Sequence, residues 1–113
     1  MKTAIIGTPL FEDYQILKWH LNQLSISEIL IFGDWAIDTL ARKYSEEKRI
    51  PLKFSKPETG TEGYFPLLKR NFLLAESCDA LVVFWDGKSS ATASIIKKAR
   101  EKGKEVMVVQ SFI

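Results

Sequence analysis

The segment Ala80–Trp85 is an unbroken run of apolar residues, and it places the strongest limit on how this chain can fold. A continuous apolar run that stops at a glycine turn, here Asp86-Gly87, is typical of a strand buried on both faces of a parallel sheet. A helical pattern follows over residues 90–102. The polar residues between this strand and this helix therefore lie at the carboxyl end of the strand. In open α/β sheets, ligands bind at that edge.

The rest of the chain alternates between strand and helix patterns. Short apolar runs predict further strands at residues 4–6, 29–32, 51–54 and 106–109, with 51–54 at an edge; amphipathic patterns predict helices after Asp13 and over residues 37–49, 66–77 and 90–102. Strands joined by helical crossovers form a parallel sheet with helices on both faces. We therefore expect an α/β fold with a mostly parallel sheet of about five strands. The length predicts a single domain over residues 1–113.

Composition excludes several classes of function. The 16 basic and 14 acidic residues give a net charge of +2, which argues against a nucleic-acid partner. No segment approaches the ~20 apolar residues of a membrane span. A lone cysteine, Cys78, fits a reducing compartment, so we expect a cytoplasmic protein in which Cys78 acts as a small buried hydrophobe. With one histidine, His20, and no nucleotide-cofactor fingerprint, the sequence predicts neither a metal site nor a bound cofactor.

Residues that are distant in the sequence are expected to meet at the carboxyl edge of the sheet. Glycines there would allow close approach of a ligand, hydroxyl and N–H groups would bind phosphate, and carboxylates would bind ribose hydroxyls or a base. This combination predicts a nucleotide-like ligand. If the protein is an enzyme, Asp86 and Asp38 are the candidate catalytic residues. The candidate ligand-binding residues are Gly7, Thr8, Gly33, Asp34, Arg70, Asn71, Asp86, Gly87, Lys88, Ser89, Ser90 and Thr92.

Two other interpretations of these patterns remain open. Asp86-Gly87 is also an ordinary turn signal, and Ser89 or Ser90 is also an ordinary helix N-cap. The segment Pro66–Ser77 is apolar around most of its circumference, which indicates a helix buried on more than one side. In so small a domain, that pattern predicts a homo-oligomer formed through this helix.

The order of these motifs resembles a known family, the SLOG superfamily of Rossmann-like domains related to DprA and to the LOG cytokinin-activating enzymes, and within it the small YspA-like group. The resemblance implies a Rossmann-like three-layer sandwich and a site for nucleotides or their derivatives at the carboxyl edge. Members of the small group are largely proposed sensors or processors of such ligands. The residues that carry the resemblance, in order, are Gly7-Thr8-Pro9-x-Phe11-x-Asp13-Tyr14, Gly33 through Asp38-Thr39-Leu40-Ala41, Arg70-Asn71, and Phe84-Trp85-Asp86-Gly87-Lys88-Ser89-Ser90-Ala91-Thr92.

The chain also departs from the family pattern. Pro9 stands where the first loop of the family tends to have an arginine, and the second loop keeps only Gly33, followed by the acidic Asp34. The glycine-rich catalytic motif of the LOG enzymes, with its glutamate, is absent. Binding of a nucleotide-like ligand is therefore the leading hypothesis. The alternatives are an N-glycosidic nucleotide hydrolase of the LOG type and a degenerate, non-catalytic module for oligomerisation or interaction.

Overall fold

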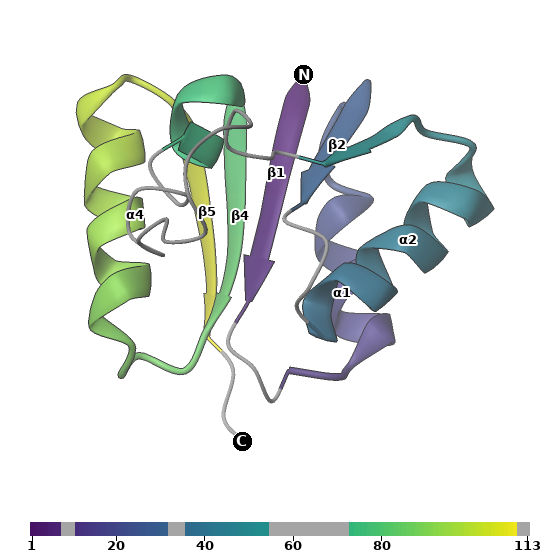
Figure 1. The fold of residues 1–113 in the computed structure, drawn as a ribbon. Helices are drawn as coiled ribbons and strands as arrows, with labels where there is room; N and C mark the ends of the chain where they lie inside the picture. Colours follow the sequence, from purple (N-terminus) through teal and green to yellow (C-terminus); the bar gives the residue numbers. More distant parts are fainter. Residues whose placement is uncertain (8–10, 32–35, 55–72, 111–113) are drawn as a thin grey trace, which may run out of the picture.

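The computed structural model describes residues 1–7, 11–31, 36–54 and 73–110, which form alternating strands and helices (Figure 1). Residues 73–77 are also helical, and they are the described part of the helix predicted over 66–77. Ends of elements differ from the predicted ones by a few residues. In chain order the elements are β1 (Lys2–Gly7), α1 (Tyr14–Leu21), β2 (Glu28–Ile31), α2 (Ala36–Lys48), β3 (Leu52–Phe54), β4 (Ala80–Trp85), α4 (Ser90–Glu101) and β5 (Glu105–Gln110).

The five strands form one sheet in the order β3-β2-β1-β4-β5, and every pair of neighbours is parallel. The prediction of a parallel α/β sandwich is therefore confirmed, as is the edge position of β3. In the centre of the sheet, β1 pairs with β4 from Thr3 to Gly7, and Gly7 lies opposite Phe84. The carboxyl ends of these two strands thus lie side by side, although 77 positions separate Gly7 from Phe84 in the sequence.

Each face of the sheet carries its own apolar core, because successive side chains of a strand point to opposite faces. On one face, α1 and α2 cover the sheet, with the core residues Ile5, Phe11, Leu17, Leu21, Ile29, Ile31, Ile37, Ala41, Tyr44, Val82, Phe84 and Val109. On the other face, α4 and residues 73–77 cover it, with the core residues Ala4, Ile6, Leu30, Leu74, Ala75, Cys78, Leu81, Val83, Ile95, Ile96 and Ala99. Cys78 is 1% exposed, as predicted for a buried hydrophobe, and burial raises the pKa of its thiol.

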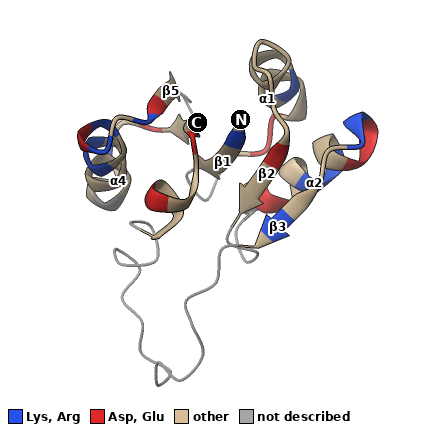
Figure 2. Cartoon of the chain, turned by 90° about the horizontal axis from the view of Figure 1, so that it is seen from above, with Lys and Arg blue, Asp and Glu red and all other residues tan. Residues whose placement is uncertain are grey.

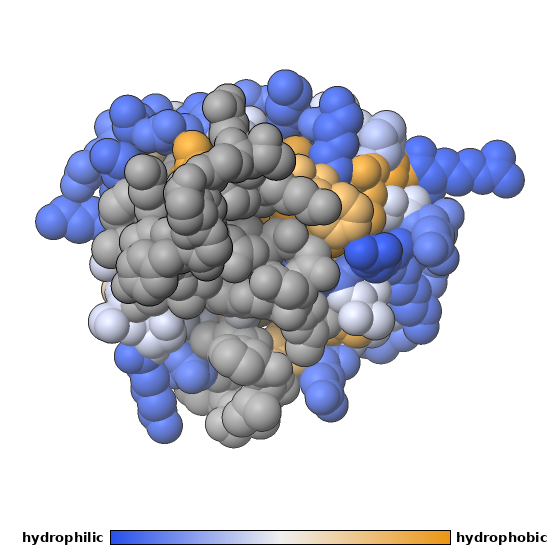
Figure 3. Space-filling view, viewed as in Figure 1, coloured by the Kyte–Doolittle hydropathy of each residue, from blue (hydrophilic) through white to orange (hydrophobic). Residues whose placement is uncertain are grey.

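Basic and acidic residues both occur along the described helices and strands (Figure 2). Among the described residues, ion pairs join Lys18 to Glu47, Lys53 to Glu28 and Lys102 to Glu76. In the view of Figure 3, hydrophilic residues make up most of the described surface. No helix in the described ranges is long and apolar enough to cross a membrane.

Candidate functional site

The strand order creates a topological switch point between β1 and β4. From β1 the chain moves outward through β2 to β3, and it then returns to the other side of β1 to form β4 and β5. The segment after β1 leads to α1 on one face of the sheet, and the segment after β4 leads to α4 on the opposite face. The two connections therefore lead to opposite faces of the sheet at this point. In doubly wound sheets, ligands bind outside the carboxyl ends of the strands at such a switch point.

The corner between β4 and α4 is held by hydrogen bonds from its own side chains. Asp86 Oδ1 accepts a hydrogen bond of 2.8 Å from the Lys88 N–H and a longer one of 3.4 Å from the Ser89 N–H. Ser89 is the N-cap of α4, because its Oγ accepts from the Thr92 N–H at 3.2 Å and from the Thr92 hydroxyl at 3.0 Å. The turn and the cap that the sequence allowed as a structural interpretation are therefore both present. Gly87 completes the turn at φ +85°, a conformation that glycine adopts without strain.

These contacts change what the corner offers to a ligand. Three of its backbone donors already have acceptors within the protein, so a phosphate would have to compete for them. The side chains of Lys88 and Ser90 are exposed, and the second carboxylate oxygen of Asp86 takes part in none of the hydrogen bonds of the turn. The corner can therefore supply a cation, a hydroxyl and a carboxylate oxygen, and fewer N–H groups than the sequence predicted.

The indole N–H of Trp85 is a further polar group at this end of β4. Its nitrogen is buried and has no hydrogen-bond acceptor among the described residues. Trp85 packs against the core beneath α4. Buried donors without an acceptor are rare in folded proteins, and each calls for an explanation such as a ligand or an ordered water.

Gly7 allows the first turn of α2 to lie against the end of β1. A Cβ atom added at Gly7 would lie 3.2 Å from Ile37 Cγ1 and 3.3 Å from both Cβ and Cδ1 of the same side chain. The glycine thus makes room for this helix–strand contact, whether or not a ligand approaches it. The same turn of α2 carries Asp38, which is 3% exposed and interacts with other groups of the protein.

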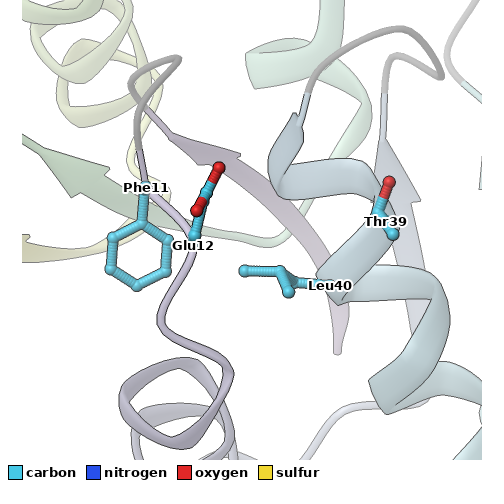
Figure 4. Close-up of a pocket in the computed structure, with 4 residues that line it drawn as sticks. All are labelled: Phe11, Glu12, Thr39 and Leu40. Atoms are coloured by element: carbon cyan, nitrogen blue, oxygen red, sulfur yellow. The ribbon is translucent and has the colours of Figure 1, made fainter.

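A depression of about 310 Å³ lies on the α1/α2 side of the carboxyl edge (Figure 4). Phe11 and Glu12 line it from the segment between β1 and α1, and Thr39 and Leu40 line it from α2. The Leu40 side chain points across the depression toward Phe11 and Glu12. Glu12 was not among the residues predicted from the sequence, and Thr39 appeared only within a family motif. Glu12 lies just before a helix and Thr39 lies in the first turns of a helix, both at this edge of the sheet. These positions could have indicated from the sequence that the two residues line a site.

Apart from the buried thiol of Cys78, the described groups with clearly shifted pKa values lie between α1 and α2. Burial and the neighbouring Glu47 carboxylate raise the pKa of Tyr14 to about 12, and burial raises the pKa of Tyr44. A hydrogen bond from Lys18 lowers the pKa of Glu47. The Lys43 ammonium lies 4.4 Å from the centre of the Tyr14 ring, and the Tyr44 hydroxyl donates to Asn22 Oδ1 at 2.8 Å. These contacts join two helices, and we assign the cluster a structural role.

The structure therefore brings part of the predicted site together. Gly7 and the corner formed by Asp86, Gly87, Lys88, Ser89, Ser90 and Thr92 share the carboxyl edge of β1 and β4, and Asp38 lies in the first turn of α2, which packs against Gly7. In the described ranges, no three histidine, cysteine or acidic side chains are grouped as metal ligands would be. Five predicted site residues lie outside the described residues: Thr8, Gly33, Asp34, Arg70 and Asn71.

The fold and the switch point define this chain as a Rossmann-like α/β protein. No protein-family model matches the chain, and a search of curated proteins finds no relative. The resemblance to the SLOG superfamily therefore stays a prediction from the sequence motifs.

Proposed function

We propose that this protein binds a nucleotide or a nucleotide-derived small molecule at the switch point between β1 and β4. The observation that carries the proposal is the parallel pairing of these strands, with Gly7 opposite Phe84 and the chain leaving toward opposite faces. In doubly wound sheets this arrangement places a ligand across the ends of the two central strands.

The described side chains at this edge support the same proposal. Lys88 and Ser90 offer a cation and a hydroxyl to a phosphate, and Asp86 keeps one oxygen for a sugar hydroxyl. The buried indole N–H of Trp85 adds a donor that has no acceptor among the described residues. Contacts from Thr8, Gly33, Asp34, Arg70 and Asn71 belong to the proposal on the sequence motifs alone.

Binding is favoured over hydrolysis of the N-glycosidic bond. A catalytic carboxylate has to reach the sugar, but Asp38 is only 3% exposed and Asp86 Oδ1 accepts two backbone hydrogen bonds. A LOG-type hydrolase remains the alternative, and it predicts that free base is released from a nucleoside monophosphate.

A cytoplasmic location and a homo-oligomer formed through Pro66–Ser77 are further parts of the proposal. Leu74 and Ala75, in the described part of that segment, are already buried against the sheet of their own chain. These two side chains are therefore not available to a second copy, whereas Glu76 and Ser77 at the end of the segment are exposed.

The proposal is tested by titration calorimetry of the wild-type protein with AMP, GMP, ADP, NAD and ADP-ribose. The matched variant is Asp86→Asn, because its side-chain carbonyl can still accept the two turn hydrogen bonds while the charge and the free carboxylate oxygen are lost. We expect at least one ligand to bind, and its affinity to fall about tenfold or more in the variant. If no ligand gives heat at millimolar concentration, the proposal is wrong. Chromatography of the same mixtures for free base tests the hydrolase alternative.

A further inference from the structure

The depression between the β1–α1 segment and α2 combines apolar side chains with polar groups. The Phe11 ring is 2% exposed and stacks on Phe84 with 4.6 Å between ring centres, so it is fixed in the core. Leu40 forms the opposite wall and is partly buried. The carboxylate of Glu12 and the hydroxyl of Thr39 belong to exposed side chains of the same depression. Its volume of about 310 Å³ is at the lower end of the range for small-molecule sites.

Glu12 is held in place by its backbone while its carboxylate is available. The next residue, Asp13, is the N-cap of α1, and its Oδ1 accepts the Ile16 N–H at 3.1 Å. This cap fixes the start of the helix and hence the point from which the Glu12 side chain projects. The Glu12 carboxylate takes part in no hydrogen bond or ion pair with another described residue. Asp13 therefore caps the helix, and the Glu12 carboxylate can accept hydrogen bonds from a ligand.

The charge carried by the described lining residues of the depression is negative, because Glu12 is the one charged residue among the four. Carboxylates repel a phosphate and accept hydrogen bonds from hydroxyl and amino groups. The depression therefore fits an uncharged, hydrogen-bond-donating group with an apolar face.

We propose that this depression, lined by Phe11, Glu12, Thr39 and Leu40, is a subsite for the nucleoside half of the ligand, with the phosphate lying outside it. The subsite rests on the proposed function and adds the orientation of the ligand to it. Glu12 accepts hydrogen bonds from the hydroxyl or amino groups of the nucleoside, and Thr39 provides a second polar contact. The partly buried Leu40 side chain contacts the flat face of the sugar or the base, and the buried Phe11 ring supports the other wall.

Two predictions distinguish this subsite from a site that is organised around phosphate. Removing the phosphate from the ligand should lower the affinity only slightly, so the dissociation constants of adenosine and guanosine should lie within about tenfold of those of AMP and GMP. Removing the charge of Glu12 should lower the affinity much more. A hydrogen bond to a charged group contributes about 1.5–3 kcal/mol, which corresponds to roughly ten- to a hundredfold in affinity. Thr39→Val removes a neutral hydrogen bond and should lower the affinity for the ligand a few-fold.

The experiment is calorimetry of wild type, Glu12→Gln, Thr39→Val and Glu46→Gln with adenosine, guanosine, AMP and GMP. Glu46→Gln is the matched control: Glu46 is an exposed residue of α2 seven positions after Thr39, and its substitution changes the net charge by the same amount. Amide NMR spectra then report whether the signals of Phe11 and Thr39 shift with the nucleoside. Because Glu12 is exposed, its substitution should leave the thermal unfolding midpoint nearly unchanged.

Each outcome separates the two proposals. Both the subsite and the proposed function are supported if nucleoside and monophosphate bind with similar affinity, and if this affinity falls in Glu12→Gln but not in Glu46→Gln. If the monophosphates bind with undiminished affinity to Glu12→Gln, or if the nucleosides fail to bind while the monophosphates do, the subsite is wrong and the proposed function stands. If none of the four compounds binds to the wild-type protein, and none of the other nucleotides does, both are wrong.

Discussion

Replacing Gly7 with alanine should destabilise the protein by crowding the contact between β1 and α2. The added Cβ would lie 3.2–3.3 Å from three atoms of Ile37 at once. Ile37 is 1% exposed and lies in the first turn of a helix. A β-branched side chain in a helix has one strongly preferred rotamer, so Ile37 cannot turn away without strain. Relief therefore requires a shift of α2 relative to β1.

Two opposing effects determine how much Gly7→Ala changes the free energy of unfolding. Overpacking a well-packed core costs about 1–3 kcal/mol. Replacing glycine with alanine also restricts the unfolded chain, which stabilises the folded state by about 0.4–1 kcal/mol. The net effect of Gly7→Ala is therefore a loss of up to roughly 2.6 kcal/mol in the free energy of unfolding.

Denaturant unfolding of a double-mutant cycle tests this reasoning. Ile37→Ala removes two of the three crowded atoms and by itself costs about 2–5 kcal/mol. In that background Gly7→Ala should become nearly neutral or stabilising, because the new methyl group fills part of the space. A coupling of about 1 kcal/mol or more between the two sites is expected. The reasoning is refuted if Gly7→Ala costs the same in both backgrounds, or if it stabilises the wild-type protein.

Three further predictions concern the β4–α4 corner and the cluster between α1 and α2. Ser89→Ala should cost about 1 kcal/mol in urea unfolding, because the Thr92 N–H loses its cap acceptor; an unchanged unfolding midpoint would contradict the assigned cap. Gly87→Ala should cost about 1–2 kcal/mol at its positive φ, and Gly87→Asn should cost less, since asparagine tolerates that conformation. Tyr14 has a folded-state pKa of about 12 against 10.0 for the unconstrained side chain. The unfolded chain therefore loses this proton first, and stability falls as pH rises from 10 towards 12. Tyr14→Phe should show a shallower alkaline loss in urea unfolding at pH 9 and pH 11, and equal losses in both proteins would exclude Tyr14 as a source.

Local sequence patterns were sufficient to predict the elements of this fold. The apolar run Ala80–Trp85 is a strand with those ends, and Asp13 is the N-cap of α1 as predicted. Gly103 follows α4 at φ +76°, as expected for a residue just beyond a helix end. These features depend on residues within a few positions of one another. The helix after Asp13 ends at Leu21, earlier than its apolar pattern, and Leu24 packs against the core from the turn that follows.

The candidate site was only partly predictable, because its decisive contacts join residues that are far apart in the sequence. Side-chain types correctly placed Gly7 and the Asp86–Thr92 corner at one edge. They did not show that Asp86 Oδ1 would accept from the Lys88 N–H, or that Glu12 and Thr39 would line one depression. A carboxylate next to a turn can accept hydrogen bonds from the backbone of the turn or from a ligand. Only the tertiary structure shows which of its oxygen atoms already accept one.

The sequence by itself determined the alternation of strand and helix, the burial of the central strands and the caps that begin the helices. Those properties follow from hydrophobic period and local hydrogen bonding, which act over one or two turns of chain. The tertiary structure alone decided that β4 returns to the far side of β1, which creates the switch point, and that Gly7 packs under Ile37. Strand order is set by packing between segments up to 77 residues apart, and no local pattern encodes which buried strand lies beside which.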